Sequence, residues 1–350
     1  MRMKRLGAIA VTLLLIAIIV MYPLDSYISR PGSAYNIAPL VDVEKGKDEA
    51  EIDGSFSLMT ITLGKATPLT YALSYFSDEM KLLPASNVRM PDEDEAEYNL
   101  RQQRLMDNSQ FNAITVAYER ANLPMTISYN GVVVMKVLEE GAAYKTLKIG
   151  DLIEKVDGVS ISQEGQFQSL IAKKVKGDQV TLDINRDGER LTKTVTLAEI
   201  PNGDGRAGLG IQFEEDRSVD TDPFVEIHTE NIGGPSAGFM FTLEIMNRIT
   251  QEDLTKGYEI AGTGEMLADG TVGRIGGADF KVIAAANDGI DIFFAPDDEI
   301  TDEMKAYNPD IETNYEEAKR TAKAIGTEME IVPVKTIDDA LRYLEDLAHK

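Results

Sequence analysis

The sequence contains no cysteine and no tryptophan, and only two of its 350 residues are histidines. A chain without cysteine cannot form disulfides, zinc–thiolate sites or iron–sulfur clusters, and it cannot use a Cys-His catalytic pair. A Ser-His-Asp triad would have to depend on His228. These absences exclude several catalytic classes, and they are compatible with a location outside the cytoplasm.

Nucleotide and metal motifs are also missing. The chain has no Gly-x-x-x-x-Gly-Lys-Ser/Thr phosphate loop, no His-Glu-x-x-His pair and no dinucleotide fingerprint. We therefore expect neither a cofactor nor a catalytic metal, and no ATP-driven unfolding module in this sequence.

Basic residues are few, with 35 Lys and Arg against 59 Asp and Glu and a formal net charge of −24. No basic patch interrupts this acidic surplus beyond the first residues, so nucleic acid is excluded as an expected partner. The length allows two or three domains.

One long apolar run occurs, from Leu6 to Tyr22, directly after Met1-Arg-Met-Lys-Arg5. At about 1.5 Å per residue, a helix over this run approaches the hydrocarbon thickness of a bilayer. The preceding positive charges predict that the N-terminus stays inside the cell and that the rest lies outside. We therefore expect residues 1–28 to form a cytoplasmic tip and a single transmembrane anchor in the cell membrane. A cleaved signal peptide is the alternative, with Gly32-Ser-Ala34 as its cleavage site.

Residues 29–124 predict a mixed region without recognisable chemistry. Alternation over Ser55–Thr62 favours a strand, whereas Pro68–Leu83 and Asn99–Asn122 favour helices.

Residues 125–200 predict a β-rich domain with one short helix. Gly141-Ala-Ala143 followed by Gly150-Asp-Leu-Ile-Glu-Lys-Val-Asp-Gly158 resembles bacterial PDZ domains. Such modules bind an extended peptide as an added strand, although a small half-open barrel without a ligand is the alternative. Gly208-Leu-Gly-Ile211 is similar to a PDZ carboxylate loop, but it follows the last predicted hairpin. It is therefore assigned to the first strand of the next domain, and the peptide-binding loop is not located.

A candidate nucleophile lies in the stretch Thr229-Glu-Asn-Ile-Gly-Gly-Pro-Ser-Ala-Gly238. The alternating residues Phe224–His228 predict a strand, the glycines a sharp turn, and Pro235 the first turn of a helix. Ser236 would then lie at a helix N-terminus, where the helix dipole favours the negative charge that develops during acyl transfer. Pro235 has no N–H, so any oxyanion donor must belong to another residue.

A serine hydroxyl needs a base to accept its proton, and lysine is the remaining candidate. Lys281 precedes Val-Ile-Ala-Ala-Ala on a predicted helix, and this apolar setting would lower its pKa. Taken alone, Ser236 could be an ordinary residue near a helix cap and Lys281 a solvated side chain, while His228 is interpreted as a strand residue.

The motifs Gly234-Pro-Ser-Ala-Gly238 and Gly276-Gly-x-x-x-Lys281 resemble the two catalytic motifs of Lon-type serine-lysine proteases. Thr263-Gly-Glu265 resembles a third block of this family. The resemblance implies that Ser236 is the nucleophile, that Lys281 is the general base and that the Thr263 hydroxyl orients the lysine. It also implies ring-shaped homo-oligomers. Relatives often carry an acidic residue three positions before the serine, where this chain has Gly233.

We therefore predict an α+β multidomain protein with a transmembrane helix, a PDZ-like domain at 125–200 and a Lon-type proteolytic α/β domain at 205–350. The predicted activity is that of an ATP-independent, membrane-anchored serine endopeptidase that cleaves exported peptides or unstructured protein segments. The alternative is a noncatalytic, membrane-anchored adaptor that binds peptides through its PDZ-like domain.

Overall fold

The computed structural model describes residues 2–44, 46, 52–201, 203, 205–229, 232–250 and 252–350, without the side chains of residues 2–4 and 8. Glu230 and Asn231, within the stretch that carries the candidate nucleophile, lie outside the described residues. The chain folds into two compact units. Unit 1 contains Met1–Asp92, Glu226–His228 and Pro235–Lys350, and unit 2 contains Glu93–Val225 and Thr229–Gly234.

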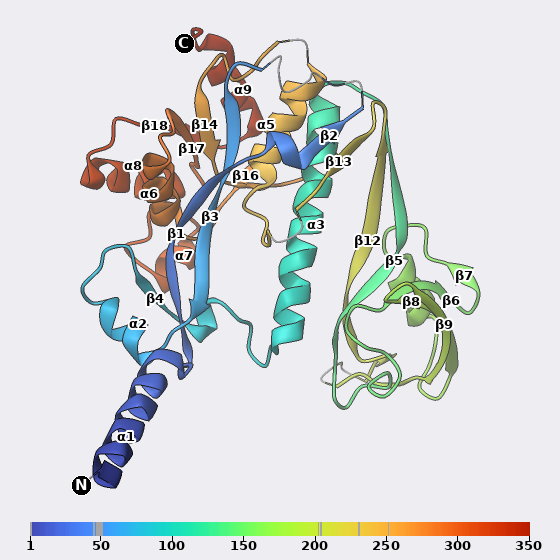
Figure 1. Ribbon diagram of the computed structural model, residues 1–350. Helices are drawn as coiled ribbons and strands as arrows, with labels where there is room; N and C mark the ends of the chain where they lie inside the picture. The colour runs from blue at the N-terminus through green and yellow to red at the C-terminus, as the bar shows by residue number, and fades with distance from the viewer. Residues whose placement is uncertain are drawn as a thin grey trace. The chain divides into compact units, whose positions relative to one another are not determined.

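A six-stranded sheet forms the centre of unit 1, in the order β18-β17-β14-β3-β1-β4. Its strands are β1 (Ser26–Asn36), β3 (Ser55–Lys65), β4 (Lys81–Pro84), β14 (Glu259–Gly262), β17 (Ile292–Pro296) and β18 (Glu330–Val334). Strand β14 runs parallel to both β3 and β17, whereas β1 is antiparallel to β3 and β4. Figure 1 shows the blue strands β1 and β3 beside the orange strands β14 and β17. Strands from the region expected to be a separate mixed segment thus complete the sheet that carries the candidate site, while the predicted domain boundaries stay predictions.

Helices pack on both faces of this sheet. On one side are α6 (Ala278–Asn287) and α8 (Asn314–Ile325), and on the other are α5 (Gly238–Ile249) and α9 (Ile337–Asp346). Successive side chains of a strand point to opposite faces. Accordingly, Phe293 joins the core formed with α6 and α8, whereas Phe294 makes edge-to-face contacts with Phe239 and Tyr343.

Local sequence sets where the important helices begin. Thr313 and Glu316 form a capping box at the start of α8. Helix α6 begins after Gly277, whose φ of 71° is a conformation that side chains rarely adopt. The other elements of unit 1 are α1 (Arg2–Met21), η1 (Ala38–Leu40), β2 (Val41–Val43), α2 (Pro68–Leu73), η3 (Ala85–Asn87), β13 (Val225–Ile227, which pairs with β2), β15 (Glu265–Met266), β16 (Val272–Gly273) and α7 (Asp302–Tyr307).

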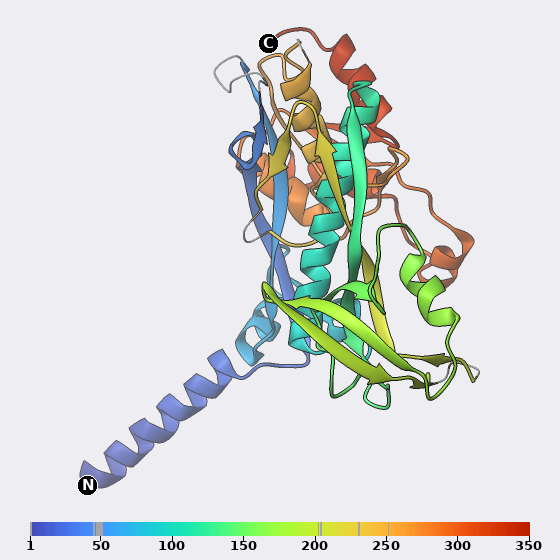
Figure 2. The same ribbon diagram turned by 90° about the vertical axis from the view of Figure 1, so that its right-hand side faces the viewer.

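Unit 2 is built on a second sheet, in the order β12-β5-β6-β8-β9, with β7 paired to β6. Figure 2 shows its long strands in green to yellow. Its elements are α3 (Glu95–Arg120), β5 (Met125–Val137), β6 (Leu152–Val156), β7 (Val159–Ser160), α4 (Gln166–Ala172), β8 (Gln179–Arg186), β9 (Glu189–Thr196), β10 (Ala198–Glu199), β11 (Ala207–Gly208) and β12 (Ile211–Thr221). An apolar core that includes Val132, Ile153 and Phe167 fills the space between the sheet and α4.

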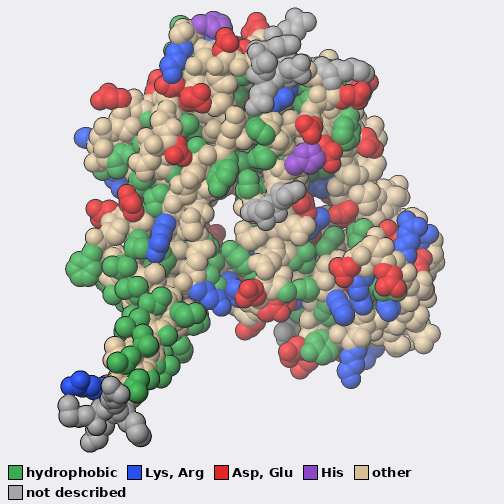
Figure 3. Space-filling model, in the orientation of Figure 1, with side chains coloured by type: hydrophobic (Ala, Val, Ile, Leu, Met, Phe, Trp, Pro, Cys, Tyr) green, Lys and Arg blue, Asp and Glu red, His purple; other side chains and the backbone are tan. Residues whose placement is uncertain are grey.

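The expected transmembrane anchor is wrong. The apolar run does form α1, and its apolar side chains are exposed (Figure 3). Nevertheless, no helix among the described residues combines the length and the apolarity that a membrane span requires. The prediction of a single-pass membrane protein with extracytoplasmic domains is therefore not supported either.

The helix predicted over Pro68–Leu83 is also too long. Helix α2 starts with a capping box between Thr67 and Thr70 and ends at Leu73. Residues Lys81–Pro84 form β4, which pairs with Ser26–Ser29 of β1. Strand pairing with a distant segment has here overridden the local helical pattern.

Candidate active site

Ser236 lies in the turn between β13 and α5, two residues before the first helical residue. Its side chain is partly buried, and its carbonyl oxygen accepts a hydrogen bond from the Gly264 N–H at 2.9 Å. In the described part of the chain, neither the Ser236 N–H nor the Ala237 N–H donates a hydrogen bond. Two unpaired donors therefore lie beside the hydroxyl, at the positive end of the α5 dipole.

Lys281 lies in the first turn of α6, where its N–H donates to the Gly277 carbonyl. Its side chain is only 2% exposed. The Nζ atom is 2.7 Å from Ser236 Oγ and 2.8 Å from Thr263 Oγ1. The structure thus brings together the three residues that the sequence motifs singled out.

Thr263 follows β14 and is fully buried. Its hydroxyl donates to the Ser236 carbonyl oxygen at 3.2 Å. A hydroxyl has a single proton, so Thr263 Oγ1 can only accept in its contact with Lys281 Nζ. This arrangement turns one N–H of the lysine towards Thr263 and leaves the lone pair of a neutral amine available to Ser236.

Burial lowers the pKa of Lys281 from 10.5 to about 7. Among the described residues, no carboxylate forms an ion pair with this amine, and its hydrogen-bond partners are two hydroxyls. An ammonium group has three donors, so the charged form would keep one N–H without a partner in a buried site. Desolvation and incomplete hydrogen bonding both favour the neutral amine, which is the form that can accept a proton.

Asn314 was not found from the sequence, although it shapes this site indirectly. Its side chain is buried, accepts from the Ile275 N–H at 2.7 Å and donates to the Ile275 carbonyl at 3.0 Å. The Asn314 N–H in turn donates to Asp298, which pairs with Arg274. These contacts fix the segment that leads into α6 and Lys281. An asparagine that follows a capping threonine carries no sequence signal for such a distant contact.

His228 is not part of this arrangement. It is exposed, and its Nε2 lies 3.2 Å from Asp42 Oδ2. In the described part of the chain it forms no hydrogen bond with Ser236 or Lys281. Its interpretation as a strand residue differs slightly, because β13 ends one residue earlier. Within the same described residues, no group of three or more His, Asp or Glu side chains could hold a metal ion.

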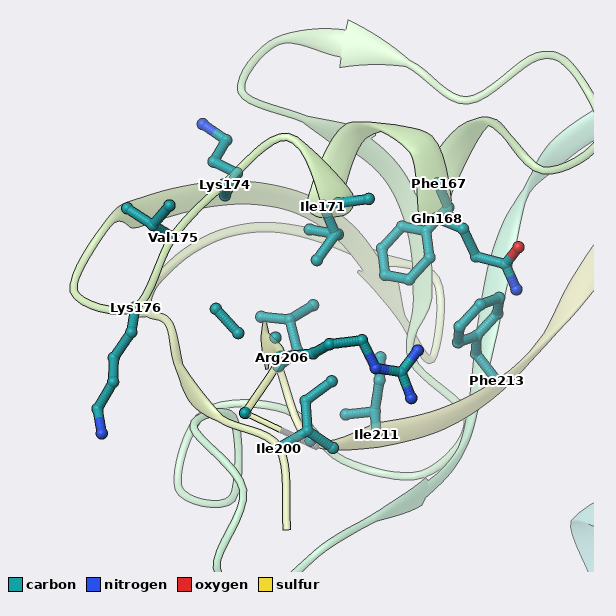
Figure 4. A pocket seen from close by; sticks show the side chains of 16 residues that line it. Phe167, Gln168, Ile171, Lys174, Val175, Lys176, Ile200, Arg206, Ile211 and Phe213 are labelled. Atoms are coloured by element: carbon teal, nitrogen blue, oxygen red, sulfur yellow. The ribbon is translucent and has the colours of Figure 1, made fainter. Parts of the chain in front are cut away.

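A second candidate site lies in unit 2. A pocket of about 710 Å³ is lined by α4, by the loop before β12 and by the beginning of β12 (Figure 4). Strand β12 pairs with β5 on one side and is the last strand of its sheet, so no strand among the described residues pairs with its other edge. Gly208-Leu-Gly-Ile211, which the sequence assigned to the next domain, lines this pocket in unit 2. The sequence alone did not locate this loop because the decisive pairing is between distant strands.

Two family models match different parts of the chain. A PDZ domain model matches residues 107–197, and a model of the Lon protease (S16) C-terminal proteolytic domain matches residues 211–345. The second match begins with β12, so the family models and the compact units divide the chain at different residues.

Individual relatives match parts of the chain. A Lon protease of Acinetobacter baumannii is 27% identical over 190 residues, which is 54% of this chain and 21% of that protein. A probable periplasmic serine endoprotease DegP-like protein of Pseudomonas putida is 30% identical over 89 residues, which is 25% of this chain and 19% of that protein. The PDZ domain of the SdrC-like protein of Listeria monocytogenes matches at 30% identity over 24% of this chain and 88% of that structure, with a TM-score of 0.23. The chain thus spans about a fifth of the length of these curated relatives. By its domain content, with a PDZ domain followed by a Lon-type C-terminal proteolytic domain, the chain is similar to PDZ-containing Lon-like serine proteases.

Proposed function

We propose that this chain is a serine endopeptidase in which Ser236 is the nucleophile, Lys281 the general base and Thr263 the residue that orients the lysine. The observation that carries the proposal is the hydrogen bond of 2.7 Å between Lys281 Nζ and Ser236 Oγ, made by a buried amine whose pKa is about 7. A general base needs contact with the proton that it removes and a pKa near the working pH.

In the proposed reaction, Lys281 takes the hydroxyl proton while Ser236 Oγ attacks the peptide carbonyl carbon. The C–N bond of the resulting tetrahedral intermediate breaks, and the ammonium of Lys281 returns its proton to the leaving amine. An ester to Ser236 remains. Lys281, neutral again, then removes a proton from a water molecule, whose oxygen attacks the carbonyl carbon of the ester. The bond from this carbon to Ser236 Oγ breaks, and Lys281 returns the proton to Oγ, which restores the serine and releases the carboxylic acid product.

The unpaired N–H groups of Ser236 and Ala237 are the proposed oxyanion donors. Pro235 cannot contribute one, as the sequence already indicates. Donors held in place before the reaction stabilise the developing negative charge without reorganisation, and one such donor accounts for about 10²- to 10³-fold in rate.

The pocket in unit 2 is the proposed peptide-binding groove. The unpaired edge of β12 can pair with an extended peptide, while the apolar wall formed by Phe167, Ile171 and Phe213 can accept one of its side chains. The N–H groups of Leu209 and Gly210 donate no hydrogen bond within the described part of the chain, and they can receive the C-terminal carboxylate of the peptide. Substrates would then be peptides or unstructured protein segments, cleaved without ATP hydrolysis by this chain.

The test compares the wild-type chain with Ser236→Ala, using casein as an unstructured substrate in the absence of ATP and a fluorophosphonate as a serine-directed probe. We expect the wild type to cleave casein and to be labelled. The Ser236→Ala protein should lose at least about 10³-fold in turnover, because removing a nucleophile has effects of this size.

A matched control is Ser128→Ala, which changes a partly exposed serine of β5 and should leave both readouts unchanged. Equal casein cleavage by the wild type and Ser236→Ala would refute the assignment. A wild-type chain that is neither labelled nor active would instead favour the noncatalytic adaptor.

A further inference from the structure

The groove in unit 2 differs in charge from the chain as a whole. The protein has a formal net charge of −24, yet the described residues that line the groove include three basic side chains and no acidic one. The basic residues are Lys174, Lys176 and Arg206. A cationic groove in an anionic protein is complementary to an anionic group of a ligand.

Only one of these three cations is available to a ligand inside the groove. Lys174 is paired with Asp157, and Lys176 lies 3.5 Å from Glu199. In Figure 4, both lysine side chains point away from the pocket. Their charges are therefore partly neutralised and directed outwards.

Arg206 is arranged differently. Its guanidinium reaches into the pocket, towards Phe213 and over Ile211 (Figure 4). The Nε atom donates to the Gly203 carbonyl at 3.1 Å, which holds the side chain in this orientation. Within the described part of the chain, the two terminal nitrogens donate to no acceptor and form no ion pair. The two terminal nitrogens of the planar guanidinium are thus available as hydrogen-bond donors beside the apolar side chains of the pocket.

A main-chain carboxylate does not need this guanidinium, because the N–H groups of Leu209 and Gly210, which line the groove, donate no hydrogen bond among the described residues. The guanidinium remains for a second carboxylate, and an acidic side chain of the same peptide is its source. Arginine binds carboxylates through two parallel hydrogen bonds, and Arg206 is exposed, so a carboxylate can reach it.

We propose that Arg206 determines the specificity of the groove by selecting peptides that carry an Asp or Glu side chain next to the apolar residue that enters the pocket. This inference rests on the proposed peptide-binding function of the groove. It is independent of the chemistry at Ser236.

The test measures binding of fluorescein-labelled short peptides by anisotropy, using the full chain with Ser236→Ala so that the peptides remain intact. The peptides end in valine and carry a single Glu at each of the preceding positions in turn, and each has a Gln counterpart. At one position we expect the Glu peptide to bind about threefold to fivefold more tightly than its counterpart, as a solvent-exposed ion pair provides. Arg206→Gln should reduce this ratio to about one while binding of an uncharged apolar peptide persists.

Two further variants test whether the preference depends on the charge of residue 206. Arg206→Glu should reverse the preference, so that a Lys peptide binds more tightly than the Glu peptide. The matched control Lys176→Gln removes a charge from the rim of the same groove and should leave the Glu/Gln ratio unchanged.

A Glu/Gln ratio near one in the wild-type groove, or a ratio that survives in Arg206→Gln, overturns the proposal. The same peptides are also measured with an amidated C-terminus. If amidation weakens binding to the wild type but not to Arg206→Gln, and the Glu/Gln ratio is the same in both, Arg206 binds the main-chain carboxylate and the proposal is overturned. Binding of apolar peptides without acid preference leaves the groove function standing, whereas the absence of any peptide binding overturns both.

Discussion

Lys281 couples the stability of the protein to pH through its buried amine. Its pKa in the folded state is about 7, whereas an unfolded lysine has a pKa of about 10.4. Between these values the unfolded chain binds a proton that the folded chain does not, so the free energy of unfolding rises with pH. Below about pH 7 both states are protonated, and the cost of burying the charge is present in full.

We expect Lys281→Met to gain stability relative to the wild type at acidic pH and to lose this advantage as the pH rises. The difference in unfolding free energy should shrink by about 2 kcal/mol between pH 7 and pH 9. Urea unfolding of both proteins across this range measures it. Lys176→Met, at an exposed position, is the control and should show no such trend; an unchanged difference for Lys281→Met would contradict the assigned pKa.

Thr263 gives a test that separates orientation of the lysine from simple packing. The wild-type rate should rise with pH and level off above about 7, because only the neutral amine is a base. In Thr263→Val the ammonium of Lys281 loses one of its two hydroxyl partners, which lowers the pKa of Lys281. The rise in rate with pH should therefore occur at lower pH than in the wild type. The kcat should fall about tenfold to hundredfold through misorientation.

The pH–rate profiles of Thr263→Val and Thr263→Ser measure this effect. Thr263→Ser keeps the hydroxyl and should retain the wild-type profile. If Thr263→Val lowers kcat but the rate rises at the same pH as in the wild type, Thr263 contributes only to packing.

Helix α6 owes its position to contacts at its N-terminal segment. Asn314→Ala would remove both hydrogen bonds to the Ile275 backbone and leave a buried N–H and C=O unpaired. We expect a loss of about 2–4 kcal/mol in unfolding free energy. Because this segment leads directly into Lys281, the kcat of the folded enzyme should also fall.

Asn247→Ala is the matched control for Asn314→Ala. Asn247 is as buried as Asn314. Its side-chain oxygen accepts a hydrogen bond from the Leu254 N–H near the end of α5, away from α6. Both variants are assayed for casein cleavage at a temperature where each is fully folded. Equal kcat values for the two would contradict a positioning role for Asn314.

The central sheet of unit 1 depends on segments that are far apart in the sequence. Strand β14, which leads to Thr263, lies between β17 and the N-terminal strand β3, where Leu58 is opposite Gly262. Leu58 is 1% exposed, so Leu58→Ala should cost about 2–5 kcal/mol. A fragment of residues 205–350 lacks β1, β3 and β4, and we expect it not to fold alone.

Thermal unfolding followed by circular dichroism checks both expectations. Thr62→Ala, on an exposed position of the same strand, is the control and should change stability little. A cooperative transition of the 205–350 fragment at the temperature of the full chain would show that β1, β3 and β4 are dispensable.

The sequence by itself determined which side chains were candidates for chemistry. Ser236 and Lys281 stand in short glycine-rich motifs, and the apolar run after Lys281 predicts a buried amine. Helix α3 and strands β3 and β5 also follow from local periodicity, because hydrophobic spacing depends only on near neighbours in the chain.

Only the tertiary structure decided how distant segments combine. It joined β3 to β14, ended α2 at Leu73, and placed Gly208-Leu-Gly-Ile211 in the groove of unit 2. It also brought Asn314 to Ile275. Strand pairing, and hydrogen bonds from a side chain to a distant backbone, use backbone groups that every residue carries. No local sequence pattern therefore predicts them.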